Sequence, residues 1–499
     1  MNNRVKHILK YVCAAATLCL VVVVVCPIFS ASVNDHQQWL NITLPGSASC
    51  RALFTVTDVP QRYAPNASLF VHNRYGYVSA DKLSVDWRAR QHPDTCGGND
   101  VAGAVQQLLL KRDSPSGAAT TDYSPLAAVL PSVLAFQGEG EASAPTVTAT
   151  TRIGAAGGLL PYVPCEIATY ADPASVAACF RARLAHQDTL WIFFMGDSKI
   201  RYLFFEFLAR SDDELHYLVK LPNAATPFAT MERERVKLKV DMEASSTLLP
   251  GLLVSFQFRT FSEQQVSKMR GSAEVKQLAR WAAGQETPPH LLVLGYAAWA
   301  TRKMEAYLCD ALSFLADMHQ IVATLLQQIS QRARVVVTSQ NRYKVKTSAA
   351  PHESSIPLGD PTFDWSEAMF LYHVRRYSLH RPPSPAFGTR AGIPKFPARI
   401  IKARLDNNSQ RHRDHLVPEV EESRVWWWDT SLPLSLAENR ECEELYLRGL
   451  TSHPVYNSSF HRCYDDNHAG TVTLGDQVTM LLNLACNSVL GAREGVCCS

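Results

Sequence analysis

Residues 193–207, FFMGDSKIRYLFFEF, join an apolar run to an amphipathic stretch through a Gly-Asp-Ser turn. The apolar run extends back to residue 189 as TLWIFFM, and its length and continuous apolar character fit a strand at the centre of a covered sheet. Gly196 permits a tight turn. Apolar residues then recur at helical spacing and predict a helix that opens at Ser198 and has one buried face: Ile200, Leu203, Phe204, Phe207 and Leu208.

Ser198 has two interpretations. In the catalytic one, its hydroxyl is a nucleophile, and the unpaired N–H groups and positive end of the helix favour an oxyanion beside it. In the structural one, Ser198 is only the N-cap of a core helix. A Gly-Asp-Ser triplet is too common to decide between them by itself. The decision depends on whether the chain supplies catalytic partners for this serine.

A serine nucleophile needs a base, usually a histidine that a carboxylate orients. Among the 16 histidines, His468 follows Asp465 by three residues, just ahead of the predicted last helix. A loop in that place can fold back over the ends of the strands. A second Asp-x-x-His pair, Asp213 and His216, comes directly after the Ser198 helix, from where a return to the serine is awkward. The spacing therefore favours Asp465 and His468 as partners.

Strands and helices alternate along the rest of the chain. Four further segments are strand-like, namely RVKLKVDM (235–242), LLVSFQFRTF (252–261), HLLVLG (290–295) and RVVVTS (334–339), and RVWWWDTSLPL (424–434) is a fifth. Two helices are marked by apolar periodicity, one over Leu308–Leu326 and a closing one over Leu474–Ala485. This alternation predicts an α/β fold whose central sheet is mainly parallel. The tryptophan triplet is expected to alternate in and out of a sheet edge rather than to stack on a sugar.

Composition divides the chain into successive regions. Residues 113–160, rich in Ala, Gly, Ser, Thr and Pro, predict a low-complexity linker or insertion, and residues 346–424, which lack periodicity, predict a surface insertion. The complete division is 1–33 cytosolic tip and signal anchor, 34–112 lumenal stem, 113–160 linker or insertion, 161–345 first part of the main domain, 346–424 insertion, and 425–499 last part of that domain.

The N-terminus predicts a membrane segment. Basic residues within the first ten positions precede an uncharged apolar stretch from Tyr11 to about Val33, which is long enough to span a bilayer. Basic residues on that flank predict a cytosolic N-terminus and a single-pass type II topology with a lumenal body. A cleavable signal peptide is the rival interpretation, because Ser30 and Ser32 can form a small-residue cleavage site, and cleavage would give a secreted protein. The length favours the uncleaved anchor.

Sequons and cysteines agree with a lumenal body. Asn-x-Ser/Thr sequons, which predict glycosylation, occur at Asn41, Asn66, Asn407 and Asn457. Of 13 cysteines, those outside the apolar N-terminal stretch form an even set that suits disulfides in an oxidising lumen. Cys165 and Cys179 flank a short segment and can pair with each other. Three more are expected to tie down the C-terminus: Cys486, Cys497 and Cys498.

Two classes of function have little support in the sequence. The formal net charge is +3, and the basic clusters lack interleaved aromatic residues, so no nucleic-acid partner is expected. The chain contains neither a Cys-x-x-Cys pair nor a His-Glu-x-x-His motif, so no metal site is expected.

Together these motifs resemble the SGNH hydrolases and the PC-esterase group within them, in which a Gly-Asp-Ser at the first strand is combined with a late Asp-x-x-His. More specifically, the chain is similar to the lumenal domain of animal sialate O-acetyltransferases. The resemblance covers roughly residues 161–345 and 425–499. It rests on FFMGDSKIRYLFFEFL (193–208), VLGYAAWA (293–300), DDNHAG (465–470), ACNSVLGAREGVCC (485–498) and PYVPCEIATY (161–170).

The resemblance implies a three-layer α/β/α domain and gives roles to individual residues. Ser198 would be the nucleophile, His468 the base and Asp465 its orienter. The Gly295 N–H would join that of Ser198 in the oxyanion hole. Arg201 would pair with Asp197 or meet an anionic substrate. Trp299 would line the acceptor site, unless it is simply a buried core residue.

The chain also departs from the family pattern. Many SGNH enzymes have an asparagine two residues after the second glycine, where this chain has Ala297, as the sialate branch also does. The family has Asp-Gly-x-His where this chain has Asp465-Asp466-Asn467-His468. Asp466 competes with Asp465 as the orienter, and a second carboxylate there would favour the protonated imidazole or change substrate access.

The function that the resemblance implies is O-acetyl transfer from acetyl-CoA to sialic acid-like glycans in the Golgi lumen, with no bound cofactor. Carbohydrate O-acetylesterase activity is one alternative, and a catalytically inactive glycan-binding or scaffold protein is another. Members of the sialate branch carry a multi-spanning acyltransferase region after the lumenal domain. A separate multi-spanning partner would supply it here, or the lumenal domain acts alone.

Overall fold

The computed structural model of the chain describes residues 50, 52–54, 124–137, 144–231, 239–261, 266–295, 308–338, 344, 370, 425–465 and 467–499. The predicted signal anchor, most of the predicted stem and most of the insertion at 346–424 lie outside these residues. Among the helices of the described part, none is long and apolar enough to cross a membrane.

An eight-stranded sheet forms the centre of the described fold. The strands β10, β9, β8, β3 and β7 are parallel neighbours, and β6, β4 and β5 continue the sheet with antiparallel pairing. The prediction of an α/β fold with a mainly parallel central sheet is confirmed. In sheet order, the strands are β10 (Val425–Trp428), β9 (Arg334–Thr338), β8 (Leu291–Leu294), β3 (Leu190–Gly196), β7 (Leu252–Phe258), β6 (Met242–Ser246), β4 (Tyr217–Leu221) and β5 (Ala224–Pro227).

Strand β3 is buried on both faces, which explains its continuous apolar sequence. Successive side chains of a strand point to opposite faces of the sheet. Ile192 and Phe194 belong to one hydrophobic cluster, whereas Phe193 and Met195 belong to the other. Its neighbours β7 and β8 pair with it in parallel on either side. The apolar run therefore marks the strand about which the two layers of the core are built.

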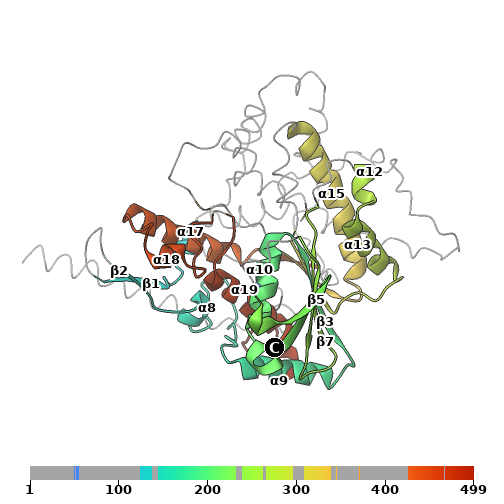
Figure 1. Cartoon of the computed structure of the whole chain (residues 1–499), viewed down its shortest axis with the longest axis horizontal. Helices are drawn as coiled ribbons and strands as arrows, with labels where there is room; N and C mark the ends of the chain where they lie inside the picture. Colours follow the sequence, from blue (N-terminus) through green and yellow to red (C-terminus); the bar gives the residue numbers. More distant parts are fainter. Residues whose placement is uncertain are drawn as a thin grey trace, which may run out of the picture.

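Helices cover both faces of this sheet (Figure 1). On one face, α9, α10 and α19 pack on the sheet and on one another, and on the other face α13 and α15 do so. The helices are α7 (Ser124–Ala128), α8 (Arg152–Ala155), α9 (Pro173–Leu184), α10 (Ser198–Ala209), α11 (Asp212–Leu215), η1 (Phe228–Thr230), α12 (Val266–Arg270), α13 (Ala273–Ala283), α15 (Leu308–Ile329), α17 (Leu432–Leu447), α18 (Pro454–Asn457) and α19 (Thr471–Leu490).

Part of the predicted stem and linker belongs to the core. Residues 124–137 and 144–160 form α7, α8 and the small antiparallel sheet of β1 (Leu134–Gln137) and β2 (Ala144–Val147). Leu130 and Ile153 there are buried, as is Phe54 from the predicted stem, which stacks on Trp426. The prediction of a flexible linker is therefore wrong for these residues. The abundance of Ala, Gly and Ser concealed a few well-spaced apolar side chains.

Two strand predictions need new boundaries. The segment 235–242 was expected to be a strand, but among its described residues only the end belongs to one, because β6 begins at Met242. The segment 424–434 is a strand only as far as Trp428, and α17 begins at Leu432. The tryptophans of β10 alternate as predicted. Trp428 and Trp426 pack into one cluster, and Trp427 packs into the other at the edge of the sheet.

Four disulfides are formed by cysteines whose side chains the structure describes, and three of them reach the C-terminal region. They are Cys50–Cys498, Cys165–Cys497, Cys179–Cys486 and Cys442–Cys463. The expectation that Cys486, Cys497 and Cys498 tie down the C-terminus is confirmed. The pairing of Cys165 with Cys179 is wrong, because α9 turns Cys179 toward α19 whereas the strand-like contact of Glu166 with Val496 sets Cys165 beside Cys497.

The disulfide between α9 and α19 offers a test of this packing. Cys179 and Cys486 are fully buried and 307 residues apart in sequence, so their bond restricts the unfolded chain strongly. We expect Cys179→Ala/Cys486→Ala to lower the free energy of unfolding by about 2–5 kcal/mol, measured by guanidinium denaturation. An unchanged denaturation midpoint would contradict the packing of α9 on α19.

Candidate active site

Ser198 lies where β3 ends and α10 begins, at the carboxyl edge of the parallel strands. It is not the cap of the helix. Asp197 is the N-cap, and its carboxylate accepts a hydrogen bond of 2.9 Å from the Lys199 N–H. Ser198 is the first helical residue, so its hydroxyl is not used for capping. The interpretation of Ser198 as a plain N-cap is therefore wrong.

Two glycines bring the backbone of β8 close to this turn. A Cβ atom on Gly196 would lie 2.5 Å from the carbonyl oxygen of Gly295 and 2.5 Å from Cγ1 of Ile200. A Cβ atom on Gly295 would also lie 2.5 Å from the side chain of Ile200. Both distances are too short for any real side chain. The glycines therefore allow β3, β8 and the first turn of α10 to meet.

The predicted role of Gly295 in an oxyanion hole is not supported. The N–H of Gly295 donates a hydrogen bond of 2.9 Å to the carbonyl oxygen of Met195, as part of the pairing of β8 with β3. An N–H committed to a strand ladder is not free for an oxyanion. Gly295 is required here for close approach. The amides that follow it, from Tyr296 onward, lie outside the described residues.

The partners of Ser198 come from the loop that precedes α19. The Nε2 atom of His468 lies 2.7 Å from Oγ of Ser198, and its Nδ1 atom lies 2.7 Å from Oδ2 of Asp465. The imidazole and the carboxylate are each about one-fifth exposed, at 20% and 21%. The three side chains form one continuous hydrogen-bonded line, so the structure brings together the residues that the sequence selected.

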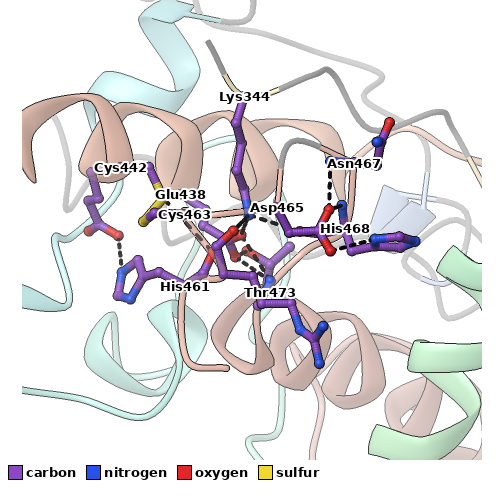
Figure 2. A network of polar contacts seen from close by, with 12 residues as sticks. Lys344, Glu438, Cys442, His461, Cys463, Asp465, Asn467, His468 and Thr473 are labelled. Carbon is purple, nitrogen blue, oxygen red and sulfur yellow. Dashed lines mark hydrogen bonds and ion pairs between the residues drawn. A yellow bond between two sulfur atoms is a disulfide. The ribbon is translucent and has the colours of Figure 1, made fainter. Parts of the chain in front are cut away.

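The three-residue spacing of Asp465 and His468 has a local explanation. The Oδ1 atom of Asp465 accepts hydrogen bonds from the N–H groups of Asn467, at 3.0 Å, and His468, at 3.2 Å. An aspartate that bonds its own following backbone in this way stabilises a turn. The turn carries the imidazole back over the second carboxylate oxygen (Figure 2). One carboxylate therefore shapes the loop and orients the histidine.

The environment keeps Asp465 ionised. Burial raises the pKa of its carboxyl, but the hydrogen bond and charge of His468, followed by the two backbone donors, outweigh it and lower the pKa to about 2. A carboxylate that stays charged stabilises an imidazolium beside it. His468 can therefore accept a proton on Nε2 while Asp465 balances the charge.

Aromatic and cationic groups support the imidazole. The ring of Tyr202 on α10 meets that of His468 edge to face, with centroids 5.0 Å apart. The guanidinium carbon of Arg462 lies 4.1 Å from the centroid of the same tyrosine ring. Arg201, predicted to bind substrate or Asp197, is buried, and its guanidinium carbon lies 5.4 Å from the Tyr202 centroid. Tyr202 therefore contacts the imidazole directly, and the two arginines contact Tyr202.

A small hollow that is open to solvent lies beside the turn that carries Ser198. It is bounded by the carboxyl ends of β8 and β9, by the first turns of α10 and by α19. Lys199 and Tyr202 line one side, and Thr338, Ala469 and Gln477 line the other. Asp197, which precedes Ser198 in the chain, also lines the hollow, whereas Ser198 and His468 are not among its lining residues.

The remaining predicted site residues fall into two groups. Asp213 and His216 lie at the far end of α10, about 18 Å along the helix from Ser198, so this second Asp-x-x-His pair is not its partner. Asn457 is exposed at the end of α18. The others lie outside the described residues: Trp299, Ala297, Asp466, Asn41, Asn66 and Asn407.

The sequence did not reveal the groups beneath the histidine loop. Lys344 and Glu438 form a buried ion pair of 2.8 Å, and Lys344 donates to the carbonyl oxygen of His468. Their positions, 94 residues apart, follow no motif or periodicity. Only the fold brings them together. Within the described part of the chain, no cluster of His, Cys, Asp and Glu could hold a metal ion.

Comparison of the chain with protein-family models, with curated proteins and with solved structures found no match in any of the three. The function is therefore inferred from the geometry of the described residues.

The lowered pKa of Asp465 predicts an acid-dependent loss of stability. Because this pKa falls from an ordinary 3.8 to about 2 on folding, Asp465 stabilises the fold above about pH 4, and this contribution disappears as the pH falls toward about 2. We expect the free energy of unfolding to fall by about 2 kcal/mol more in the wild type than in Asp465→Asn between about pH 5 and pH 2. Denaturation curves at each pH measure this, and parallel pH dependences of the two proteins would contradict it.

Proposed function

We propose that the chain is a serine-dependent acyltransferase of SGNH type, which moves O-acetyl groups onto glycans through an acetyl-serine intermediate. The proposed domain is the three-layer α/β/α domain of that family, with Ser198 as nucleophile, His468 as base and Asp465 as its orienter. One observation carries the proposal: Oγ of Ser198 and Nε2 of His468, 270 residues apart in sequence, lie 2.7 Å from each other.

Three features distinguish this arrangement from an incidental hydrogen bond. The serine opens a helix at the carboxyl edge of parallel strands, where ligands of α/β proteins commonly bind. The histidine is oriented by a carboxylate that remains ionised. A hollow adjoins the seryl turn. A catalytically inactive scaffold would have no need to retain all three, so the geometry favours an enzyme.

The proposed reaction has two halves. In the first, Nε2 of His468 takes the proton of Ser198, and Oγ attacks the acetyl carbonyl carbon to form a tetrahedral oxyanion. Its collapse breaks the bond to the donor, whose thiol or alcohol leaves with the proton from His468, and acetyl-serine remains. In the second half, His468 takes a proton from an acceptor hydroxyl, whose oxygen attacks the acetyl carbonyl; the bond to Oγ then breaks, and His468 returns the proton to Ser198.

The oxyanion requires N–H donors that are not already used. Among the described residues, no hydrogen-bond acceptor is bound to the Ser198 N–H, which lies in the first turn of α10. We assign this amide as one donor. The Gly295 N–H is committed to Met195 and is not assigned as a donor.

The substrates and the compartment are proposed from the sequence resemblance. The donor would be acetyl-CoA and the acceptor a sialoside or a related glycan, with a separate multi-spanning partner to supply the acetyl group. The four disulfides support an oxidising compartment. We propose a single-pass type II protein of the Golgi membrane with the catalytic domain in the lumen.

Hydrolysis is the second candidate function. The imidazole and carboxylate are about one-fifth exposed, and the adjoining hollow opens to solvent. Water can therefore reach the acetyl-serine as readily as a sugar hydroxyl, unless a bound acceptor excludes it. This openness favours a carbohydrate O-acetylesterase as the alternative.

Paired assays separate the two activities. The purified protein is incubated with acetyl-CoA and a sialoside, and separately with an O-acetylated sialoside, and the products are identified by mass spectrometry. Acetylated sialoside in the first reaction supports the transferase. Acetate release in the second, without transfer in the first, would establish the esterase and reject the transferase.

Replacement of the nucleophile gives a direct prediction. Ser198→Ala should abolish acetyl transfer, acetyl-ester hydrolysis and labelling by a fluorophosphonate probe, since each requires the seryl oxygen. Ser175→Ala is a matched control, because Ser175 also lies in the first turn of a helix, α9, and bonds only the carbonyl of Asp172 among the described residues. The control should keep full activity. Labelling of Ser198→Ala at the wild-type rate would exclude Ser198 as the nucleophile.

A further inference from the structure

One face of α17 supports the loop that carries Asp465 and His468. Glu438, Glu441 and Cys442 are spaced three and four residues apart on this helix and therefore share a face. Oε2 of Glu441 accepts a hydrogen bond of 2.8 Å from Nε2 of the buried His461, and Cys442 is disulfide-bonded to Cys463. Figure 2 shows Glu438, Cys442, His461 and Cys463 close to Asp465 and His468. Two anchors thus fix the loop just before its catalytic residues.

Lys344 supplies a third anchor from outside the helix. Its Nζ atom donates to three backbone carbonyl oxygens of the loop, those of His461 at 2.7 Å, Arg462 at 3.0 Å and His468 at 2.8 Å. It also lies 2.8 Å from Oε1 of Glu438. The side chain of Lys344 is only 6% exposed. All of its donors point into the loop and the carboxylate, as Figure 2 shows.

Glu438 extends the same network to the start of α19. Both of its oxygens accept from the N–H of Gly470, at 2.9 and 3.1 Å, and Oε2 also accepts from the hydroxyl of Thr473 at 2.6 Å. Burial raises the pKa of Glu438, but the charge of Lys344, then that of His461, and the hydrogen bonds to Lys344 and Thr473 hold it below its ordinary value. The carboxylate is therefore charged, and it is bonded to the chain that follows His468, at Gly470 and Thr473.

Stability alone does not account for this ion pair. Desolvation of two buried charges often cancels their attraction, and well-packed apolar residues can replace such pairs without loss of stability. What the pair does provide is a fixed position for the His468 carbonyl and the neighbouring Gly470 amide. A displacement of about 1 Å at a catalytic group can reduce the rate by about 100-fold.

We propose that Lys344 and Glu438 are positioning residues that fix the backbone on both sides of His468, and so hold its imidazole in line with Ser198 and Asp465. This inference rests on the proposed function of the three residues. Lys344 acts through the His468 carbonyl and Glu438 through the Gly470 amide. Neither touches the reacting atoms.

The test removes the charges together. Lys344→Met/Glu438→Gln in the full chain leaves no unpaired buried charge, and the glutamine oxygen can still accept from Gly470 and Thr473. Only the ties from Lys344 to the three loop carbonyls are then lost. If this variant does not fold, Lys344→Gln/Glu438→Gln, which keeps two N–H donors at residue 344, replaces it.

Arg210→Met is the matched control. Arg210 is another cation that donates to backbone carbonyls, those of Tyr170 at 3.2 Å and Gly475 at 3.1 Å, and it lies at the opposite end of α10 from Ser198. Its loss removes comparable bonds to α19 without touching the histidine loop. It should lower the melting temperature but leave the labelling of Ser198 unchanged.

Two measurements decide the proposal. The maximal rate constant of Ser198 labelling by a fluorophosphonate should fall by about 100-fold in the double variant. The probe concentration that gives half of this maximal rate should stay unchanged. The downfield proton resonance of the bond between His468 Nδ1 and Asp465 should broaden or disappear. Wild-type labelling and an unchanged resonance in the double variant would overturn the proposal.

The resonance also separates this proposal from the proposed function. If the wild type is not labelled at all but shows the downfield proton, and the double variant loses it, the positioning role stands and the acyl chemistry fails. If the wild type is labelled and the double variant keeps both signals, the acyl chemistry stands and the positioning role fails.

Discussion

The hydrogen bond between Ser198 and His468 is the constraint on which the described structure depends. Its length of 2.7 Å joins a turn at the centre of the sheet to a loop near the end of the chain. The bond forms only if β3, α10 and the loop before α19 keep fixed relative positions. Strands β7 and β8, which pair with β3 on either side, fix the position of the turn at its end. Helix α19 packs directly on α10. The sheet therefore positions the serine, and the helix layer positions its partner.

The histidine loop is held by directional interactions in addition to the apolar packing of Cys463 and Ala469. A disulfide, a buried histidine–glutamate contact and a lysine bonded to three carbonyls all restrain it. Apolar packing is tolerant of small displacements, whereas such bonds are sensitive to distance and angle. Asp465 adds a turn that bonds its own backbone. This arrangement suits a loop whose imidazole must be placed within a fraction of an ångström.

The sequence predicted the parts of the fold that obey local rules. Continuous apolar runs marked β3 and β8, helical spacing marked α10 and α19, and the Asp-x-x-His turn selected His468 because that turn is a local structure. Other features depend on contacts between distant residues. No local sequence pattern predicts three of these features, because they arise only when the layers pack together. They are the pairing of Cys179, the burial of Phe54 and the position of Lys344. The use of the Gly295 amide in the strand ladder was likewise visible only in three dimensions.

The central claim is that Ser198 accepts an acyl group with the help of His468. The protein would be mixed with an acetyl donor, quenched in acid within the first turnover, digested and analysed by mass spectrometry. We expect one added acetyl group on the peptide that contains Ser198. In His468→Ala this group should form far more slowly. If another residue is acetylated and Ser198 stays unmodified throughout, this claim is contradicted.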